Sequence, residues 1–179
     1  MELYLERGFE LTTVAEIAGR AGLTARTFFR YFADKREVLF AGSASLQEAL
    51  VVAIEGAPDA ASPMEAVAAA LDAAAALLGE GREYSRQRQS VITANAELRE
   101  RELIKMASLS AALAEGLRRR GVTNPDASLA AEAGVVVFRV AFERWVTHPR
   151  ERDLSQMMSE SLDQLKALTA GQRLVPSPT

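Results

Sequence analysis

Cysteine is absent from this sequence, and histidine occurs once, at His148. Without cysteine, the chain offers no disulfide framework, no thiolate metal site and no cysteine nucleophile. His148 stands beside Pro149 at the end of a predicted helix, and no metal-ligand set or catalytic triad groups around it in the sequence. We therefore expect no enzyme activity, no catalytic or metal-binding residue and no cofactor.

Long apolar runs are missing as well. No stretch holds about 18 uninterrupted apolar residues, the usual length of a membrane-spanning helix. The chain begins MELYLERGFE, which is acidic and amphipathic, whereas an export signal is basic and then apolar. These features, together with the lack of thiols, predict a soluble cytoplasmic protein that has no membrane partner.

The sequence is slightly acidic, with a formal net charge of -3, but its charge is unevenly distributed. Within residues 20–36 the single acid is Asp34. The basic residues of this stretch are Arg20, Arg26, Arg30, Lys35 and Arg36. Because electrostatic attraction is screened within about 10 Å at cellular salt, a local basic cluster is enough to bind phosphates. The sequence thus predicts a localised nucleic-acid surface on a protein that is acidic elsewhere.

Apolar residues recur with helical spacing along most of the chain, and no segment alternates with the period of a β-strand. Glycine and proline fall between the periodic segments, so the sequence predicts an all-α fold. The predicted helices are 2–7, 14–21, 25–32, 34–55, 63–78, 82–94, 96–120, 125–147 and 151–169. We expect a helix-turn-helix domain of three short helices over residues 1–42, a larger helical domain over 43–170 and a flexible tail over 171–179.

Two of the short helices carry clear start signals. Thr13 begins a capping box that ends at Glu16, and Thr24 caps the next helix after a break at Gly22. Two short helices joined in this way form a helix-turn-helix pattern, whose second helix enters the major groove of DNA.

Lys35 and Arg36 follow Asp34, which with Glu37 forms the pattern of another helix start. Positive charge in the first turn of a helix opposes its dipole and costs about 0.3–1 kcal/mol per residue. A DNA phosphate bound by Lys35 would compensate for this cost. The alternative is that Lys35 is solvated or pairs with Asp34 or Glu37.

The spacing of these residues resembles the DNA-binding signature of the TetR family of transcriptional regulators. The resemblance rests on TTVAEIA at residues 12–18, AGLT at 21–24, and TFFRYF at 27–32 followed by Lys35. It implies a sequence-specific DNA-binding regulator whose partner is double-stranded operator DNA. Family members usually have more chain before the segment LYLERGF, so we expect a shortened first helix.

The resemblance also implies roles for individual residues. Thr13 and Lys35 would hold phosphates. The residues that would enter the major groove are Thr24, Ala25, Arg26 and Thr27. Arg26 is the preferred base reader, because arginine forms bidentate hydrogen bonds with guanine.

Three further positions on the same helix correspond to DNA contacts in the family. Arg30 would reach a base or a phosphate one turn after Arg26. Phe29 and Tyr31 correspond to positions where the family often has tyrosine and histidine on the DNA backbone. Tyr31 keeps a hydroxyl for this contact, whereas Phe29 has none and would pack against a sugar or a thymine methyl group.

The helix predicted over 125–147 is apolar nearly all round. Val135, Phe138 and Trp145 lie on one stripe, while Val136 and Val140 cover part of the remaining surface. Such a helix needs cover on both sides, and with the last helix it would suit a four-helix dimer interface. The alternative is burial within one subunit. The TetR resemblance favours a homodimer, because these proteins pair through their last two helices.

Charged residues interrupt two of the long helices. Arg139 and Glu143 are four residues apart, and we predict that they pair with each other, at the interface or toward an internal cavity. The alternating acids and arginines of residues 97–102 indicate a solvated helix face.

The TetR resemblance implies an effector pocket among the middle helices, and thus a small-molecule partner. The candidate ligand-binding residues are Tyr84, Arg88, Phe138 and Phe142. The segment AFERWV at 141–146 is similar to a subgroup that includes the mycofactocin regulator, some members of which respond to acyl-CoA. The sequence therefore predicts a homodimeric repressor that an effector releases from DNA; the alternative is a ligand-independent helical DNA-binding or architectural protein.

Overall fold

The computed structural model describes residues 1–148 and 152–171. Its elements are α1 (Glu2–Arg7), α2 (Val14–Arg20), α3 (Ala25–Tyr31), η1 (Lys35–Phe40), α4 (Ser43–Glu55), α5 (Pro63–Leu78), η2 (Gly79–Gly81), α6 (Arg82–Ala94), α7 (Ala96–Arg119), α8 (Asn124–Thr147) and α9 (Leu154–Thr169). None of the residues in these two ranges forms a strand, so the predicted all-α fold is confirmed. The flexible tail predicted over 171–179 falls, except for its first residue, outside the described residues.

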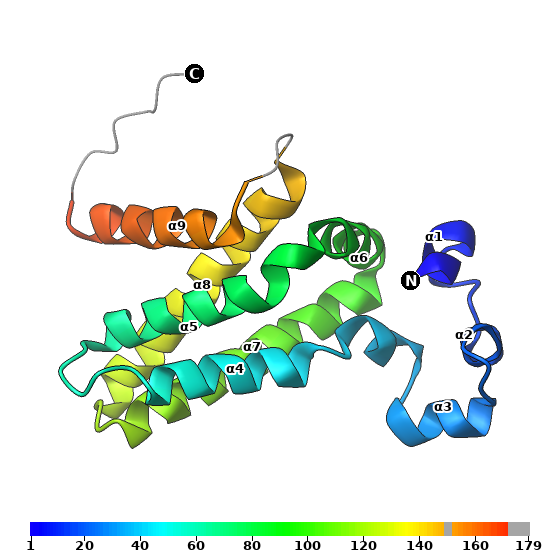
Figure 1. Cartoon of the computed structure of the whole chain (residues 1–179), viewed down its shortest axis with the longest axis horizontal. Helices are drawn as coiled ribbons and strands as arrows, with labels where there is room; N and C mark the ends of the chain where they lie inside the picture. The colour runs from blue at the N-terminus through cyan, green and yellow to red at the C-terminus, as the bar shows by residue number, and fades with distance from the viewer. Residues whose placement is uncertain (149–151, 172–179) are drawn as a thin grey trace.

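The short helices α1, α2 and α3 lie at one end of the molecule, and η1 leads from them into the larger helical body (Figure 1). In that body α4 contacts both α5 and α7, while α8 contacts α5, α7 and α9. The DNA-binding pattern of the sequence therefore occupies one end of the fold.

The predicted continuous helix over 34–55 is wrong. A 3-10 segment, η1, ends at Phe40, and α4 begins after Gly42. Gly42 stands at the break, and glycine costs about 1 kcal/mol in a helix interior. Leu39 and Phe40, just before the break, are both buried against residues of α6 and α7.

The same stretch, Lys35–Glu55, is long and apolar enough to cross a membrane by length and composition alone. The core helices of soluble proteins often have this composition. Here Leu50 and Ile54 belong to the main core and are 1% and 0% exposed.

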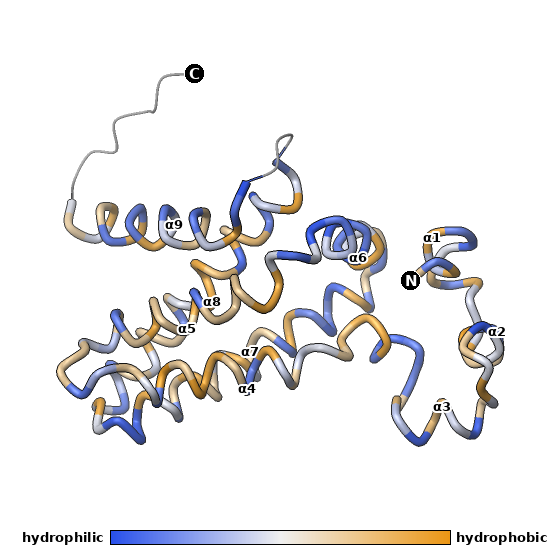
Figure 2. Tube along the Cα trace, in the orientation of Figure 1, coloured by the Kyte–Doolittle hydropathy of each residue, from blue (hydrophilic) through white to orange (hydrophobic). Residues whose placement is uncertain are grey.

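The main core lies between α4, α5, α7, α8 and α9. Apolar residues run along α4, α5, α7 and α8 (Figure 2). Large side chains that are almost completely buried in this core include Ile54, Leu117, Trp145 and Met157. At Gly134, α8 approaches α5 so closely that a Cβ atom would lie 2.7 Å from Val67 Cγ1.

A second group of buried residues, which we call the junction cluster, joins the two predicted domains. Its buried members are Tyr4, Phe9, Leu39, Phe40, Val91, Ile92 and Leu98. They come from α1, the connection after it, η1, α6 and α7. The helix-turn-helix region therefore packs against α6 and α7 through apolar contacts.

The faces of α8 have different surroundings. Phe138 and Trp145 are buried within the subunit, whereas Val136 and Val140 are 42% and 41% exposed. The predicted ion pair between Arg139 and Glu143 is wrong, because the described side chains form no such pair. Both residues are exposed, and an exposed pair gains only about 0–1 kcal/mol, so a spacing of four does not by itself decide whether the two side chains pair.

Candidate functional site

The two helices of the helix-turn-helix begin at the predicted capping residues. Thr13 Oγ1 accepts a hydrogen bond from Glu16 N at 3.3 Å, and Glu16 Oε2 accepts one from Thr13 N at 2.8 Å. Thr24 Oγ1 accepts from Thr27 N at 3.2 Å. Between the helices Gly22 has a φ of 69°, a left-handed conformation that glycine adopts without steric cost. Local hydrogen bonds thus fix where α3 begins.

Three residues of the predicted basic cluster are engaged inside the protein. Arg20 pairs with Glu2 at 2.6 Å, and Arg36 pairs with Asp34 at 2.5 Å. Lys35 Nζ donates to three backbone carbonyl oxygens, at 2.8, 3.1 and 3.2 Å; they belong to Phe9, Glu10 and Thr12. Arg26 and Arg30 of α3 are therefore the cations of residues 20–36 that have neither an acidic partner nor a backbone carbonyl partner among the described residues.

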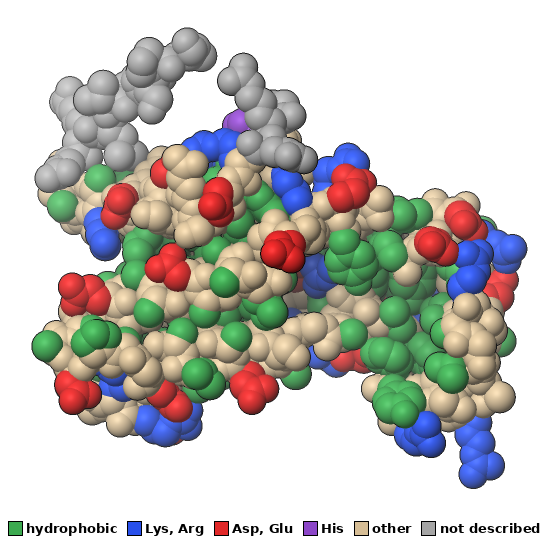
Figure 3. Space-filling view, viewed as in Figure 1, with side chains coloured by type: hydrophobic (Ala, Val, Ile, Leu, Met, Phe, Trp, Pro, Cys, Tyr) green, Lys and Arg blue, Asp and Glu red, His purple; other side chains and the backbone are tan. Residues whose placement is uncertain are grey.

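The predicted DNA-contacting residues of α3 lie on its accessible side. Thr24, Arg26 and Arg30 are exposed, while Ala25 and Thr27 are partly buried. Arg26 forms no hydrogen bond or ion pair with another residue in the described ranges. In the space-filling view, basic side chains project from the end of the molecule that carries α3 (Figure 3). This end is an accessible surface with the charge that phosphates and guanine edges require.

The aromatic residues of α3 divide between surface and core. Phe29 and Tyr31 are 57% and 66% exposed, whereas Phe28 is 4% exposed. Arg30 Nη2 donates to Tyr31 Oη at 3.0 Å, and its guanidinium carbon lies 4.9 Å from the Tyr31 ring centroid. Phe28 contacts the rings of both Phe29 and Phe32. Tyr31 and Arg30 thus form a joined polar unit beside the exposed Phe29 ring.

Lys35 does not pair with Asp34 or Glu37, and its contact with a phosphate stays a prediction. Its ammonium group lies over the Phe9 ring, 4.3 Å from the centroid, in addition to its three carbonyl contacts. These partners compensate for positive charge in the first turn of η1, without Asp34 or Glu37. A phosphate contact by Lys35 would require the ammonium to leave or share these carbonyls.

Two buried polar residues, for which no individual role was predicted, complete this arrangement. Tyr4 Oη donates to the Lys35 carbonyl at 2.6 Å. Thr12 is 1% exposed, and its hydroxyl bonds the carbonyls of Gly8 at 2.8 Å and Leu3 at 3.2 Å. Burial, and secondarily the charge of Asp34, raises the pKa of Tyr4 above its ordinary value. Tyr4 therefore stays protonated and donates this bond under physiological conditions.

Glu37 connects η1 with α7. Glu37 Oε1 accepts from Arg101 Nε at 2.6 Å, and Oε2 accepts from Lys105 Nζ at 3.0 Å. Burial opposes ionisation of this carboxyl, but the hydrogen bonds from Arg101 and Lys105 outweigh burial and lower the pKa of Glu37. The sequence pattern suggests a capping box, yet the Glu37 carboxylate faces α7. Charge thus fastens the helix-turn-helix region to the larger domain.

The solvated face predicted over residues 97–102 is wrong for three of its members. Besides the Arg101–Glu37 pair, Glu97 lies 3.8 Å from Arg36. Glu102 lies 3.7 Å from Arg88 of α6. These side chains find partners because this part of α7 faces η1 and α6, elements that are distant in sequence.

A cavity of about 1110 Å³ lies among η1, α4, α6, α7 and α8. Small-molecule pockets usually have volumes of about 300–1,000 Å³, so this one has room for a sizeable ligand. All four predicted ligand-binding residues line it: Tyr84, Arg88, Phe138 and Phe142. The structure therefore brings these residues together, and their contact with a ligand stays a prediction.

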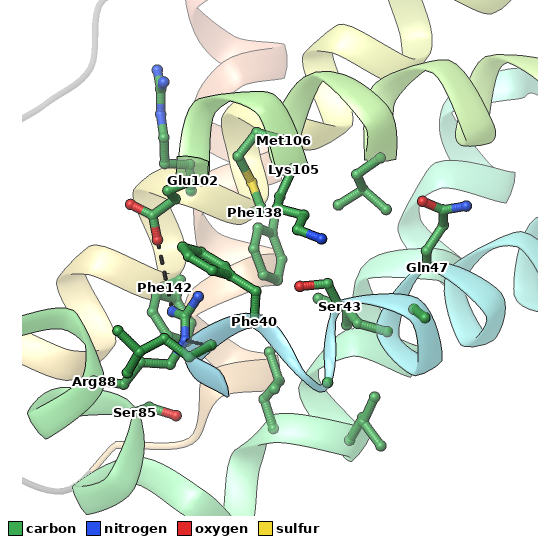
Figure 4. Close-up of a pocket in the computed structure, with 18 of the residues that line it drawn as sticks. Phe40, Ser43, Gln47, Ser85, Arg88, Glu102, Lys105, Met106, Phe138 and Phe142 are labelled. Carbon is green, nitrogen blue, oxygen red and sulfur yellow. Dashed lines mark hydrogen bonds and ion pairs between the residues drawn. The ribbon is translucent and has the colours of Figure 1, made fainter. Parts of the chain in front are cut away.

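The walls of the cavity are mostly aromatic and aliphatic where Phe40, Met106, Phe138 and Phe142 face it (Figure 4). The Phe138 and Phe142 rings stack with centroids 5.8 Å apart and an interplanar angle of 18°. The sequence did not single out Phe40 or Met106. Neither residue has a signal in the sequence, because adjacent apolar residues are common in regular helices, as at Met157 and Met158 of α9.

Polar groups gather on the wall formed by α6 and α7. Arg88 Nε donates to the Leu39 carbonyl at 2.6 Å, and its Nη1 lies 3.7 Å from Glu102 Oε1 (Figure 4). Burial lowers the pKa of Arg88, an effect that the charge of Glu102 opposes. Gln89 donates to Glu102 at 3.4 Å, while its Oε1 is enclosed and receives no donor from the described residues. This wall has unused hydrogen-bonding capacity.

Two family models match the chain. Residues 1–41 match the one described as bacterial regulatory proteins, tetR family, and residues 61–170 match the MftR C-terminal domain. Over 81 residues the chain is 37% identical to the HTH-type transcriptional regulator TcmR of Streptomyces glaucescens. This match covers 45% of the chain and 36% of TcmR, so it spans about a third of that relative.

Solved structures share the fold. FadR of Thermus thermophilus, a TetR family transcriptional repressor solved in complex with lauroyl-CoA, is 25% identical, with a TM-score of 0.59. The similarity covers 100% of this chain and 94% of FadR. PfmR, a TetR family transcriptional regulator that is also from Thermus thermophilus, is 23% identical with a TM-score of 0.51, over 92% of each chain. These relatives are transcriptional regulators rather than enzymes.

Proposed function

Because this chain belongs to the TetR family and is a DNA-binding transcriptional regulator of the repressor type, we propose that it acts as a cytoplasmic homodimer that an apolar small molecule releases from its operator. The observation that carries this proposal is the joining of an exposed basic helix, α3, to a large cavity through the short element η1.

In this proposal α3 reads the operator. Arg26 bonds a guanine edge in the major groove, where Thr24, Ala25 and Thr27 approach neighbouring bases. Its exposure and its lack of partners within the described ranges favour this role. Arg30 and Tyr31 contact phosphates or a base, and Phe29 packs against a sugar or a thymine methyl group.

In this proposal Thr13 and Lys35 bind phosphates, although both side chains already have hydrogen-bond partners within the protein. The Thr13 hydroxyl bonds Glu16 Oε2 at 2.9 Å, and the Lys35 ammonium bonds three carbonyls. Each must share or exchange an internal partner to hold a phosphate. Lys35 also positions the connection between α1 and α2, whether or not DNA is bound.

Dimerisation through α8 and α9 is supported by apolar side chains that the subunit leaves uncovered. Val136 and Val140 of α8 are exposed, and Leu168 of α9 is 59% exposed. When α8 and α9 of two subunits pack together symmetrically, these side chains become buried. The same packing fixes the distance between the two α3 helices. A separation of about 34–36 Å fits successive major grooves on one face of DNA.

The proposed effector is an apolar molecule that occupies the cavity, in contact with Tyr84, Arg88, Phe138 and Phe142. The lauroyl-CoA complex of the FadR relative supports an acyl chain as its apolar part. The effector would favour a state in which the two α3 helices no longer match the groove spacing.

A titration of the protein against DNA that flanks its own gene, followed by fluorescence anisotropy at low salt, tests the regulator proposal. Arg26→Ala should weaken specific binding by about 5- to 150-fold, the effect of one lost bidentate base contact. Arg99→Ala is the matched control, because Arg99 is exposed on α7 and far from α3 in sequence. Absence of any binding by the native protein would refute the proposal.

Addition of lauroyl-CoA to the preformed DNA complex separates the proposal from its alternative. A ligand-responsive repressor loses affinity for the DNA, by about 5- to 150-fold for a coupling of ordinary strength. A ligand-independent DNA-binding or architectural protein shows the same affinity with lauroyl-CoA and without it.

A further inference from the structure

Arg88 connects the cavity to η1 through its side chain. It lies on α6, and its Nε donates to the Leu39 carbonyl at 2.6 Å. Its guanidinium carbon lies 5.0 Å from the centroid of the Phe40 ring. Both partners belong to the last two residues of η1, and both Phe40 and Arg88 line the cavity (Figure 4). One cationic side chain thus borders the cavity and holds the end of η1.

The carbonyl that Arg88 binds needs a donor. The last carbonyl groups of a short helix have no partner within it, and the chain after η1 turns at Gly42 before α4 begins. Arg88 supplies a donor from another helix at this point. Loss of that donor leaves the Leu39 carbonyl enclosed in the junction cluster, where Leu39 is 3% exposed.

η1 contacts the DNA-binding helices as well as α7. At its start the Lys35 carbonyl accepts from Tyr4 of α1, and the Lys35 ammonium binds the connection between α1 and α2. In its middle Glu37 is bound by Arg101 and Lys105 of α7. A shift at Leu39 and Phe40 therefore acts on a six-residue element that contacts both regions of the protein.

Arg88 is also able to bind a second acceptor. Of its nitrogen atoms, Nε donates to Leu39 and Nη1 faces Glu102, while Nη2 donates to none of the described residues. Guanidinium groups present five N–H donors and bind carboxylate or carbonyl oxygens strongly. The neighbouring walls, formed by Phe40, Phe138 and Phe142, are apolar. The chemistry that fits is an apolar chain that ends in a carboxylate or a carbonyl oxygen.

We propose that Arg88 is the residue that couples the cavity to DNA binding: an oxygen acceptor on an apolar ligand draws its guanidinium away from the Leu39 carbonyl and the Phe40 ring, and the end of η1 is released. This inference rests on the proposed function, since it requires that the effector occupies this cavity. The ligand group that Arg88 recognises is an oxygen acceptor, and the contact that this recognition breaks is the hydrogen bond from Arg88 to the Leu39 carbonyl.

Two probes of equal chain length test the requirement for an acceptor. Dodecanoate carries a carboxylate, and 1-dodecanol carries a neutral hydroxyl on the same chain. With the native protein, dodecanoate should weaken binding to operator DNA by at least about fivefold, at the lower end of ordinary coupling. Dodecanol should change it less than dodecanoate does. An equal effect of the two probes, or no effect of dodecanoate, overturns the proposal.

Arg88→Met tests the residue, because methionine keeps an apolar stem and removes the guanidinium. The quantity compared is the ratio of DNA affinities with and without dodecanoate, so a change in basal affinity does not decide the result. This ratio should fall to near one in Arg88→Met. It should stay at the native value in Arg86→Met, because Arg86 is exposed on the same helix and pairs with Glu83. A native ratio in Arg88→Met overturns the proposal.

Amide hydrogen exchange of the native protein gives a second measurement that needs no variant. Dodecanoate should speed exchange at residues 39–43, at the end of η1, and leave the interior of α5 unchanged. Unchanged exchange at residues 39–43 overturns the coupling role even if DNA is released. If the native protein fails to bind DNA at all, the proposed function itself has failed, and the two failures are thereby distinguished.

Discussion

Tyr4 and Lys35 are bonded by a short hydrogen bond, in which the Tyr4 hydroxyl donates to the Lys35 carbonyl at 2.6 Å. The ammonium of the same lysine donates back to the connection that follows α1, at the carbonyls of Phe9, Glu10 and Thr12. The first helix and η1 therefore hold each other in place through a side chain and a backbone group of one residue.

Tyr4→Phe should lower the free energy of unfolding by about 1–3 kcal/mol, because it leaves the Lys35 carbonyl without its buried donor. Urea denaturation followed by circular dichroism measures this change. Tyr31→Phe is the matched control, since Tyr31 is 66% exposed and its hydroxyl is bonded on the surface. Equal stability of Tyr4→Phe and the native protein would contradict the assigned role.

Alkaline pH should destabilise the native protein more than Tyr4→Phe. Burial raises the pKa of Tyr4 above its ordinary value of 10.0, so the folded state holds this proton more strongly than the unfolded state. The resulting stability is complete below about pH 10 and is lost as the pH rises above it. Between pH 9 and about pH 10.5 and above, the denaturation midpoint of the native protein should therefore fall by more than that of Tyr4→Phe. Parallel behaviour of the two proteins would show that Tyr4 does not contribute.

Glu37→Gln should weaken the attachment of η1 to α7. Two charged hydrogen bonds, to Arg101 and Lys105, are lost or weakened, and we expect a destabilisation of about 1–3 kcal/mol. The lowered pKa of Glu37 means that its contribution is present above its ordinary pKa of 4.5 and is lost as the pH falls further. Denaturation at pH 7 and near pH 3 measures the difference, which should shrink at the lower pH. Glu100→Gln, a change at an exposed residue of α7, serves as the control.

Gly134→Ala should destabilise the larger domain. A Cβ atom at this position lies 2.7 Å from Val67 Cγ1, and Val67 is buried and β-branched, so it has little freedom to move. Overpacking of this kind costs about 1–3 kcal/mol, against a gain of about 1 kcal/mol in helix propensity, so the net change is a destabilisation of up to about 2 kcal/mol. Gly19→Ala in α2 should show only the gain, because no atom lies within 4 Å of its added Cβ. Thermal denaturation of both variants checks the opposite signs.

Val136→Glu with Val140→Glu should convert the proposed dimer to a monomer. Both side chains are exposed in the subunit, so the double change places two charges in the interface without disturbing the core. Light scattering measures the mass, and operator binding should fall with the loss of the second α3. Val52→Glu, at a residue of α4 that is 61% exposed, should leave the mass unchanged. A native protein that is monomeric at every concentration would refute the dimer.

The capping residues of the DNA-binding region could be predicted from the sequence because each acts over a few positions. Thr13, Thr24 and Asp34 bond backbone groups two or three residues ahead. Such capping depends only on residues that are close together in the sequence, so the sequence is enough to predict it. The pairs Tyr84–Arg88 and Phe138–Phe142 each lie on one face of a helix because their members are four residues apart. That these residues face a pocket was implied by the TetR resemblance and not by their spacing.

The partners of Lys35 and Glu37 could not be predicted in this way. The carbonyls that bind Lys35 are 23 to 26 residues away. The residues that bind Glu37 are 64 and 68 positions away. Tertiary packing decides such contacts, and it also interrupts the helix predicted over 34–55. The cavity wall formed by Phe40 depends on that interruption, so it could not be predicted either.

The engagement of Arg20, Lys35 and Arg36 by internal partners also bears on how the protein searches a chromosome. Attraction to DNA of arbitrary sequence grows with the number of phosphates that a protein neutralises and thus with the counterions that it displaces. A subunit whose cations are largely paired with its own groups should therefore bind unrelated sequence weakly, with a shallow dependence on salt. Weak binding of this kind holds fewer copies of the regulator away from the operator, because unrelated sites vastly outnumber it.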